Sequence, residues 1–261
     1  SAEQQVEVAR AVIVDDNQRR AATLAAALRL GGQLAVSVVA PDDPALRGEL
    51  LPARSLQTGE RPQGIQVYGL PELEAISPFL RELWDVCDVL GVPLEGAISE
   101  FAPGQVELTL KHKPDALEAA DDALRYKRAA KGVALRHGCE ATFMAKPWAD
   151  QAGNGFHVHV SFNDAAGNNL CAADDPEGSD LLKHAIGGMK ALMADCMAIL
   201  APNANSYRRF KANSYAPVAP TWGVNNRTVS LRVPAGPPPT RHVEHRVAGA
   251  DANPYLVMAV L

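Results

Sequence analysis

Three absences narrow the class of protein before any motif is considered. The chain has no run of about 18 apolar residues, so we expect no transmembrane helix and no membrane as a partner. It does not open with a basic segment followed by an apolar stretch, so we expect no secretory signal. Basic residues are not in excess, because 25 Lys and Arg stand against 30 Asp and Glu and the net charge is −5. This balance argues against nucleic acid as the main partner.

Cysteines are few and widely separated, at positions 87, 139, 171 and 196. They form no CxxC motif and no Cys/His spacing typical of a metal site. Cys87 and Cys196 fall within helical apolar patterns, where a free thiol acts as a small hydrophobe. We therefore expect reduced thiols and a cytoplasmic protein.

The composition is that of an ordinary globular protein. The 261 residues are 47% hydrophobic and 21% charged. That length is enough for one large domain or two modest ones, each with a core of its own.

Residues 8–52 predict a strand, a helix and a second strand. Residues 11–14 form a short apolar run that ends in two aspartates, and Asn17 is placed to cap a helix to about Leu30, with Gly31 as its stop. Residues 33–40 are apolar and rich in β-formers. The segment resembles the start of a response-regulator receiver domain, in which the acidic pair helps bind Mg²⁺. No third strand with a phosphorylatable aspartate follows, so an ordinary βαβ edge with a solvated acidic turn is the favoured interpretation.

A polar stretch with several prolines and glycines, residues 51–64, reads as a linker. It divides the chain into a βαβ segment, residues 1–53, and a larger unit, residues 54–261. The larger unit carries helical apolar patterns over residues 76–90, 114–137 and 180–200, and alternating patterns over residues 106–110, 142–146, 156–162, 227–233 and 242–247. This mixture predicts the α+β class, with a mainly antiparallel sheet and helices.

The most informative stretch is a glycine-containing loop, residues 153–155, that leads into an alternating strand, residues 156–162. In an extended strand His157, His159 and Ser161 point to one face, while the apolar residues between them point to the other. The glycines allow a backbone to approach a ligand closely. A hairpin with two surface histidines explains the stretch equally well when it is taken alone.

Three other segments carry polar groups suited to a ligand. Glu100 and Glu107 are separated by a Pro-Gly break that can bring both carboxylates to one side, an arrangement that is costly unless a cation lies between them. Two surface glutamates are the alternative. Arg227 and Arg232 suit a bidentate grip on phosphate or carboxylate.

The third segment is residues 242–246, where His242, Glu244 and Arg246 share one face of a strand. A plain salt bridge between the last two is the alternative to a metal and an anionic substrate. A site for a metal-bridged phosphate uses carboxylates, histidine and arginines, and these residue types occur together in the predicted sheet. The reaction class that fits them is phosphoryl transfer, in which positioning and charge neutralisation do most of the catalysis.

From about Val67 onward the chain resembles the catalytic domain of the glutamine synthetase family. Its motifs are most similar to those of the branch that includes γ-glutamylpolyamine synthetases. Six ordered motifs carry the resemblance: Glu100–Glu107 (EFAPGQVE), Ala141–Pro147 (ATFMAKP), Gly153–His159 (GNGFHVH), Asn205–Phe210 (NSYRRF), Trp222–Thr228 (WGVNNRT) and Glu244–Tyr255 (EHRVAGADANPY). The resemblance implies a curved, mainly antiparallel sheet. It also implies that ATP phosphorylates the γ-carboxylate of glutamate and that an amine then displaces phosphate to form an amide.

The resemblance also implies a pair of divalent cations, Mg²⁺ or Mn²⁺. By motif position, Glu100 and Glu107 would hold one cation. His157 and Glu244 would hold the other, which bridges the phosphates of the co-substrate ATP.

The substrate residues follow from the same motif positions. Gly153, Arg209 and Arg246 would hold glutamate. Arg227 and Arg232 would grip phosphates and stabilise the transferring group. His159 and Ser161 would lie beside the nucleotide.

The sequence departs from the family pattern at several places. Family members usually have a Glu-x-Glu strand that gives one ligand to each metal, and residues 33–40 contain no carboxylate. The family's ammonia-site glutamate aligns with Tyr215, which favours an amine other than ammonia as substrate. A nucleotide-contacting lysine of the family aligns near Pro239, an arginine near His242, and an asparagine with Ala152. The family's N-terminal β-grasp domain and C-terminal helical region have no counterpart in the sequence.

Two functions therefore stand as expectations. The first is an ATP-dependent ligase that joins glutamate to an amine and, if complete, assembles as a homo-oligomer. The second is a non-catalytic or regulatory relative that binds nucleotide or glutamate but lacks a complete metal site. A receiver-type signalling module is the weakest interpretation, because the phosphoacceptor strand is missing.

Overall fold

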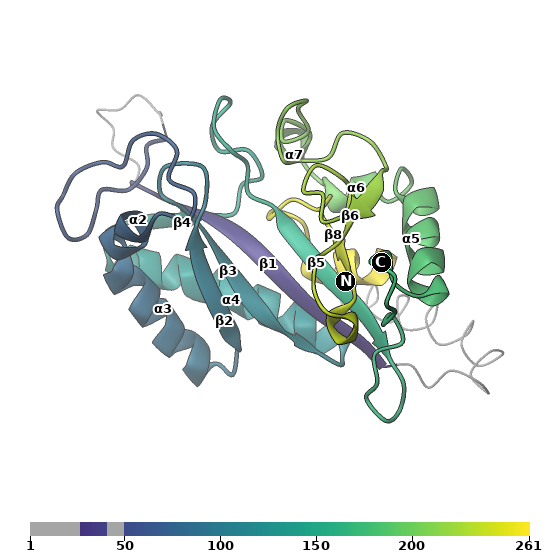
Figure 1. The fold of residues 1–261 in the computed structure, drawn as a ribbon. Coiled ribbons are helices and arrows are strands. Elements are labelled where there is room, and N and C mark those ends of the chain that lie inside the picture. Colours follow the sequence, from purple (N-terminus) through teal and green to yellow (C-terminus); the bar gives the residue numbers. More distant parts are fainter. Residues whose placement is uncertain (1–26, 41–49) are drawn as a thin grey trace, which may run out of the picture.

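The computed structural model describes residues 27–40 and 50–261, and all structural statements concern these residues. Eight strands of the described chain form one sheet in the order β2-β3-β1-β5-β8-β7-β6, with β4 paired to β1 (Figure 1). The strands are β1 Ala27–Val39, β2 Leu94–Ser99, β3 Gln105–Lys113, β4 Glu140–Thr142, β5 Phe156–Asn163, β6 Trp222–Val224, β7 Leu231–Val233 and β8 Val243–His245. Every pair is antiparallel except β6 and β7. The predicted α+β class with a mainly antiparallel sheet is confirmed.

The long strand β1 lies in the middle of the sheet, between β3 and β5. Its second half confirms the strand predicted over residues 33–40. The predicted helix is wrong over residues 27–30, which belong to β1. Leu30 pairs with Lys113 on one side and with Val160 on the other, and such pairing overrides helix propensity.

The glycines at positions 31 and 32, interpreted as a helix stop, have a different role inside β1. A Cβ atom on Gly32 would lie 3.2 Å from the ring of Phe156, and one on Gly31 would lie 3.2 Å from the backbone of His112. Glycine in a strand interior commonly marks such a close approach.

Residues on both sides of the predicted division at residue 53 belong to one sheet. Because β1 pairs with strands on both sides, residues 27–39 lie inside the sheet that the larger unit builds. The predicted strand at residues 11–14, the acidic turn after it and the start of the predicted helix lie outside the described residues.

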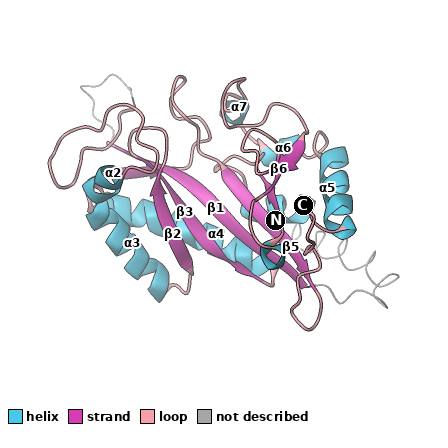
Figure 2. Cartoon of the chain, viewed as in Figure 1, coloured by secondary structure: helices cyan, strands magenta, loops and turns pink. Residues whose placement is uncertain are grey.

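Helices α3 Ser77–Val89 and α4 Ala116–Arg136 lie along one side of the sheet (Figure 2). Helix α4 begins at Asp115, whose side chain accepts hydrogen bonds from the backbone N–H groups of Leu117 and Glu118. Its buried face is mostly alanine around the fully buried Tyr126, so the helix packs closely on the strands. Leu124, predicted to face inward, is instead 48% exposed.

The remaining helices are α5 Asp180–Leu192 and the short α2 Leu70–Ala75, α6 Met197–Leu200, α7 Ala204–Tyr207, η2 Pro238–Thr240 and α8 Pro254–Val260. The helix predicted over residues 180–200 is therefore interrupted, because residues 193–196 form tight turns. The strands predicted over residues 142–146, 227–233 and 242–247 are confirmed only in part, at β4, β7 and β8.

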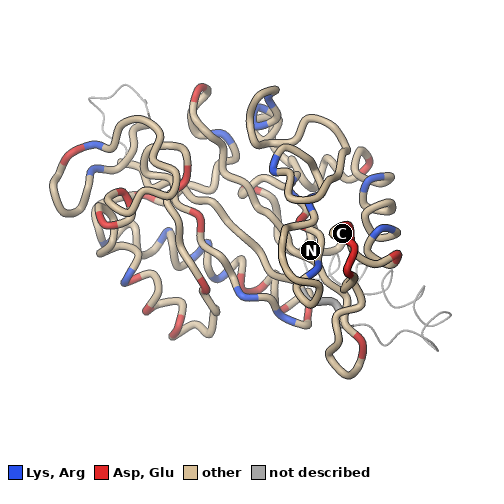
Figure 3. Tube along the Cα trace, in the orientation of Figure 1, with Lys and Arg blue, Asp and Glu red and all other residues tan. Residues whose placement is uncertain are grey.

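Three further observations concern the surface, the thiols and the helices. Acidic and basic residues are interspersed along the described chain (Figure 3). All four cysteines are free, and three of them are buried. None of the helices in the described ranges is both long and apolar enough to cross a membrane.

Candidate functional site

Strand β5 has the two faces that its sequence predicts. Phe156, Val158 and Val160 are at most 2% exposed, whereas His157, His159 and Ser161 are partly exposed on the opposite face. Because β5 lies between β1 and β8, this polar face occupies the middle of the sheet. The interpretation of the stretch as a surface hairpin is therefore wrong.

Strand β8 places a buried carboxylate beside β5. Glu244 is in register with His159 and is fully buried. Its Oε2 accepts a 2.7 Å hydrogen bond from Arg232, and its Oε1 is paired with Arg246 and lies 3.3 Å from Nδ1 of His157. Burial alone would raise the pKa of Glu244, but the hydrogen bond from His157 and the charge of Arg246 outweigh it and hold the pKa well below its usual range.

A second pair of carboxylates lies across β1 from this cluster. Glu107 on β3 is 8% exposed, and its pKa is raised to about 8 by burial and by the charges of Glu100 and Glu244. The turn between Glu100 and Glu107 folds back, with the N–H of Glu100 donating to the carbonyl of Gln105 and with Gly104 at φ +70°. The structure thus brings the two carboxylates to one side, as the Pro-Gly break predicts.

The strand positions between these two carboxylate groups carry no charge. In the register of the sheet, Ala35 on β1 lies opposite Glu107 and Gln33 lies opposite His157. Directly opposed residues of an antiparallel pair share a face. The carboxylates that the sequence lacks on this strand are therefore missing from the positions that join Glu107 to His157.

These residues fit a divalent cation at one pair and not at the other. Among the described residues, no three His, Cys, Asp or Glu side chains gather where a metal ion could be held. Glu100 and Glu107 form a buried acidic pair that a cation would relieve. At the other pair, both oxygens of Glu244 already contact arginines, so a cation would have to compete with Arg232 and Arg246.

The other predicted arginines surround the same face. Arg209 is 5% exposed and donates from Nη2 to the backbone carbonyls of Val247 and Ala248, the latter at 2.8 Å. Arg227 lies at the rim, where it donates to the hydroxyl of Tyr68 at 2.9 Å. Burial raises the pKa of Glu100, and the charge of Arg227 partly offsets that rise.

Tyr215 also lies at the rim. It is 54% exposed, its ring centroid is 5.3 Å from that of Phe101, and its backbone carbonyl is 3.5 Å from Nη2 of Arg246. The backbone of Tyr215 thus contacts the arginine that pairs with Glu244, while its ring packs on Phe101.

Three buried polar residues that the sequence analysis missed hold the glycine loop in place. Asn154 is fully buried, and its Oδ1 accepts hydrogen bonds from Gln105 at 2.8 Å and from Ser37 at 3.2 Å. Gln105 also donates to the carbonyl of Gly153 at 3.0 Å. An asparagine between two glycines just before a buried strand was the signal available in the sequence, since a loop there needs side-chain partners for its backbone.

Gly153 itself permits a close approach that a side chain would block. A Cβ atom at this position would lie 2.5 Å from the carbonyl oxygen of Ala145 and 2.8 Å from Cγ of Arg209. We expect Gly153→Ala to displace the loop and lower the free energy of unfolding by about 1–3 kcal/mol. Gly132→Ala, on the exposed side of α4 with no atom within 4 Å of its Cβ, is the control and should raise stability by roughly 0.5–1 kcal/mol. Urea denaturation of both variants measures the difference, and equal stabilities would contradict the steric argument.

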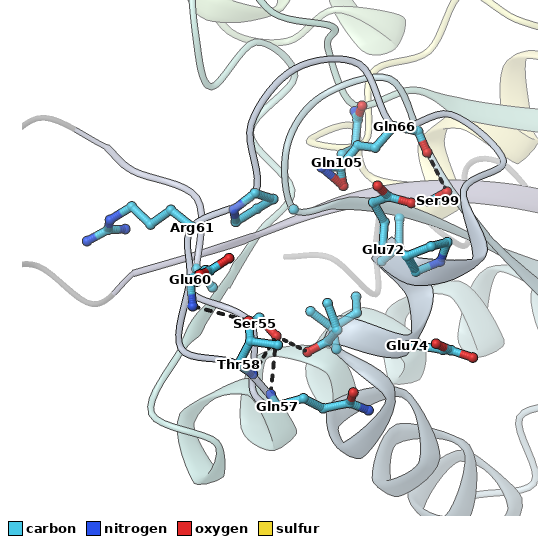
Figure 4. Close-up of a pocket in the computed structure, with 17 residues that line it drawn as sticks. Ser55, Gln57, Thr58, Glu60, Arg61, Gln66, Glu72, Glu74, Ser99 and Gln105 are labelled. Atoms are coloured by element: carbon cyan, nitrogen blue, oxygen red, sulfur yellow. Dashed lines mark hydrogen bonds between the residues drawn. The ribbon is translucent and has the colours of Figure 1, made fainter.

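A separate cavity of about 330 Å³ lies beside the site (Figure 4). It is bordered by residues 53–66, helix α2 and the adjoining ends of β2 and β3. The side chain of Ser99 in its wall donates to the backbone carbonyl of Gln66 at 2.7 Å. Of the residues described above, Gln105 lines the cavity and also binds the glycine loop. The residues predicted to bind metal or substrate do not line it.

The sheet, the motifs on it and their order along the chain define a family. The model for "Glutamine synthetase, catalytic domain" matches residues 34–261, so the chain belongs to the glutamine synthetase family. The match begins inside β1, which agrees with the place of that strand in the sheet.

Particular relatives include amine-specific ligases. The chain is 45% identical over 214 residues to γ-glutamylputrescine synthetase PuuA of Escherichia coli K12, covering 82% of this chain and 45% of that protein. It is 44% identical over 171 residues to glutamate–isopropylamine ligase of a Pseudomonas species, covering 65% and 37% respectively. The chain thus spans less than half the length of these relatives.

Solved structures agree with the fold. The structure titled "GmaS/ADP complex-Conformation 1" superposes with a TM-score of 0.76 at 28% identity, covering 98% of this chain and 58% of that one. "Apo GmaS without ligand" gives a TM-score of 0.73 at 30% identity, covering 90% and 52%.

Proposed function

We propose that the chain carries the catalytic core of an ATP-dependent ligase that joins the γ-carboxylate of glutamate to an amine. The observation that carries the proposal is the cluster around Glu244, where two arginines and two histidines share the polar face of the sheet's centre. Relatives named as glutamate–amine ligases support the same reaction.

The reaction needs anions to be gathered and neutralised. The γ-phosphoryl group of ATP moves to an oxygen of the γ-carboxylate, and ADP leaves. The nitrogen of the amine then attacks the acyl carbon, phosphate leaves, and the amine loses a proton. Arg232 on β7 and Arg227 at the rim supply the fixed positive charge that such a transfer requires.

Glutamate would be held at the other end of the polar face. Gly153 offers backbone without a side chain, and Arg246 would contribute its guanidinium from beside His157. Arg209 is packed against Gly153 and would act from beneath the loop. His159 and Ser161, two residues apart on β5, would contact the nucleotide.

Mg²⁺ or Mn²⁺ would supply charge neutralisation at the phosphates when bound. Glu100 and Glu107 would hold one ion, whereas Glu244 beside His157 is already occupied by Arg232 and Arg246 and does not fit a second.

The amine would enter beside Tyr215. Where a carboxylate would favour a small cation, the paired rings of Tyr215 and Phe101 offer an apolar surface. This surface suits the alkyl part of an alkylamine or a polyamine.

A non-catalytic relative that binds nucleotide or glutamate is the second candidate. The observation that favours it is the uncharged pair Gln33 and Ala35 between the two carboxylate groups.

A homo-oligomer is part of the proposal for the complete ligase.

Phosphate release from ATP tests the proposal. With Mn²⁺ present, release should depend on both glutamate and an amine such as putrescine. Arg227→Gln should lower the rate by roughly a hundredfold or more, because it removes charge from the transferring group. Since Arg227 is exposed, its loss should change stability by less than about 0.5 kcal/mol.

Arg128→Gln, at an exposed arginine of helix α4, is the matched control and should leave the rate unchanged. ATP binding by calorimetry without turnover would favour the non-catalytic relative. Release that ignores glutamate would refute the ligase.

A further inference from the structure

The nucleotide half of the site contains two histidines in direct contact. Nδ1 of His159 on β5 lies 2.9 Å from Nε2 of His242, and the ring centroids are 5.0 Å apart. Nδ1 of His242 lies 2.7 Å from the carbonyl oxygen of Thr240.

The carbonyl of Thr240 determines where the protons are. A carbonyl oxygen only accepts, so Nδ1 of His242 must carry the hydrogen that it donates to Thr240. In neutral imidazole the other nitrogen is then a bare lone pair. Nε2 of His242 therefore accepts a hydrogen bond, and the donor 2.9 Å away is the Nδ1–H of His159.

The same logic fixes the remaining nitrogen. With its hydrogen on Nδ1, the neutral His159 presents a lone pair at Nε2. That atom is buried and has no hydrogen-bond partner within the described residues.

The strand on one side of His159 contributes no side chain at the paired position. In the register of β1 and β5, His159 lies opposite Gly31, which has no side chain, while Glu244 lies opposite it on β8. Nε2 of His159 is therefore a buried acceptor without a partner, and a donor group on a ligand would satisfy it.

We propose that His242 is a positioning residue that locks His159 as a hydrogen-bond acceptor for the nucleoside half of the nucleotide. The donor on the ligand is a ribose hydroxyl or the amino group of the base. A phosphate oxygen does not fit, because two lone pairs would face each other. The inference rests on the proposed function only for the identity of the ligand.

Two substitutions separate the lock from simple packing. His242→Arg places a pure donor against Nδ1 of His159 and should move the hydrogen of His159 to Nε2. His242→Gln keeps an acceptor at the contact and should preserve the original tautomer. The tautomer is read directly from long-range ¹H–¹⁵N correlation spectra of the full chain with ¹⁵N-labelled histidine.

Nucleotide affinity gives the second readout. For ATP, His242→Arg should weaken binding about tenfold, the loss expected for one hydrogen bond replaced by two opposed donors, whereas His242→Gln should stay within about twofold. Calorimetry with 2′-deoxy-ATP, 3′-deoxy-ATP and the 6-deamino analogue identifies the donor group of the ligand. The analogue without that group should bind the wild-type chain about tenfold more weakly than ATP does. On His242→Arg the same analogue should bind no more weakly than ATP.

The outcomes are distinguishable. An Nε2–H tautomer of His159 in the wild-type chain, or equal losses of ATP affinity in both variants, would overturn the lock. An Nδ1–H tautomer that shifts only in His242→Arg supports it even where the wild-type chain binds no ATP. In that case the nucleotide assignment falls together with the proposed function.

Discussion

Glutamates placed at positions 33 and 35 are expected to raise the affinity of the chain for Mn²⁺ by roughly a hundredfold, about tenfold for each added carboxylate ligand. The reason is the register of the sheet. Ala35 lies opposite Glu107 and Gln33 opposite His157, so Gln33→Glu and Ala35→Glu add an oxygen ligand to each half of the site. Both positions share the face that carries the existing carboxylates.

The double variant should also become metal-dependent in its stability. Ala35 is 5% exposed, so a glutamate there adds a buried charge near Glu107 that is costly without a cation. Its melting temperature should therefore fall in EDTA and recover with Mn²⁺. The Mn²⁺ signal in electron paramagnetic resonance and calorimetric titration measure the affinity independently of any activity.

A variant with the same change in charge provides the control. Gln57→Glu/Gln63→Glu adds two carboxylates at exposed positions of residues 53–66 and should leave Mn²⁺ binding unchanged. Equal binding by both double variants would mean that nonspecific charge, and not the position on β1, sets the affinity. A gain of glutamate- and amine-dependent phosphate release in Gln33→Glu/Ala35→Glu over the wild-type chain would favour a ligase impaired at its metal site.

The parts of the fold that the sequence predicted are those with a strong local period. The two faces of β5 and the course of α3 and α4 follow from alternation or from apolar spacing, because burial on one face imposes that pattern. The helix predicted to end at Leu30 failed because pairing on both sides of β1 decides the conformation there, and that pairing is not visible locally. The same holds for the break after Leu192, where turns interrupt an unbroken apolar pattern.

The candidate site could likewise be predicted from the sequence only in part. Motif spacing brought out the residues that bear charge, including Glu244 and Arg232, because their chemistry is visible in the sequence. It offered the Glu244–Arg246 salt bridge only as an alternative, and it could not show that Arg232 binds the other oxygen of Glu244, since that contact arises from the register of β7 and β8. Nor could it show that Gln33 and Ala35 face the site, which depends on the pairing of β1.

Glu244→Gln is expected to destabilise the fold by about 3–5 kcal/mol, the loss found when one member of a buried charge cluster is removed. Glu244 is the carboxylate that compensates Arg246, which is 5% exposed, and Arg232, whose side chain is 12% exposed. Without it two guanidinium groups stay close together and largely desolvated. Thermal and urea denaturation should register the change as a fall of at least roughly 6 °C in melting temperature.

A second substitution separates the charge effect from lost packing. Glu244→Gln/Arg246→Met removes both members of the closest pair, so that only Arg232 remains uncompensated. It should therefore be more stable than Glu244→Gln alone. Asp164→Asn, at a partly exposed aspartate of the loop after β5, should cost less than about 1 kcal/mol. If Glu244→Gln unfolded as late as the wild-type chain, the arginines would not depend on Glu244, and its carboxylate would be free to hold a cation. A large loss means that any cation bound there must displace arginines that already stabilise the fold.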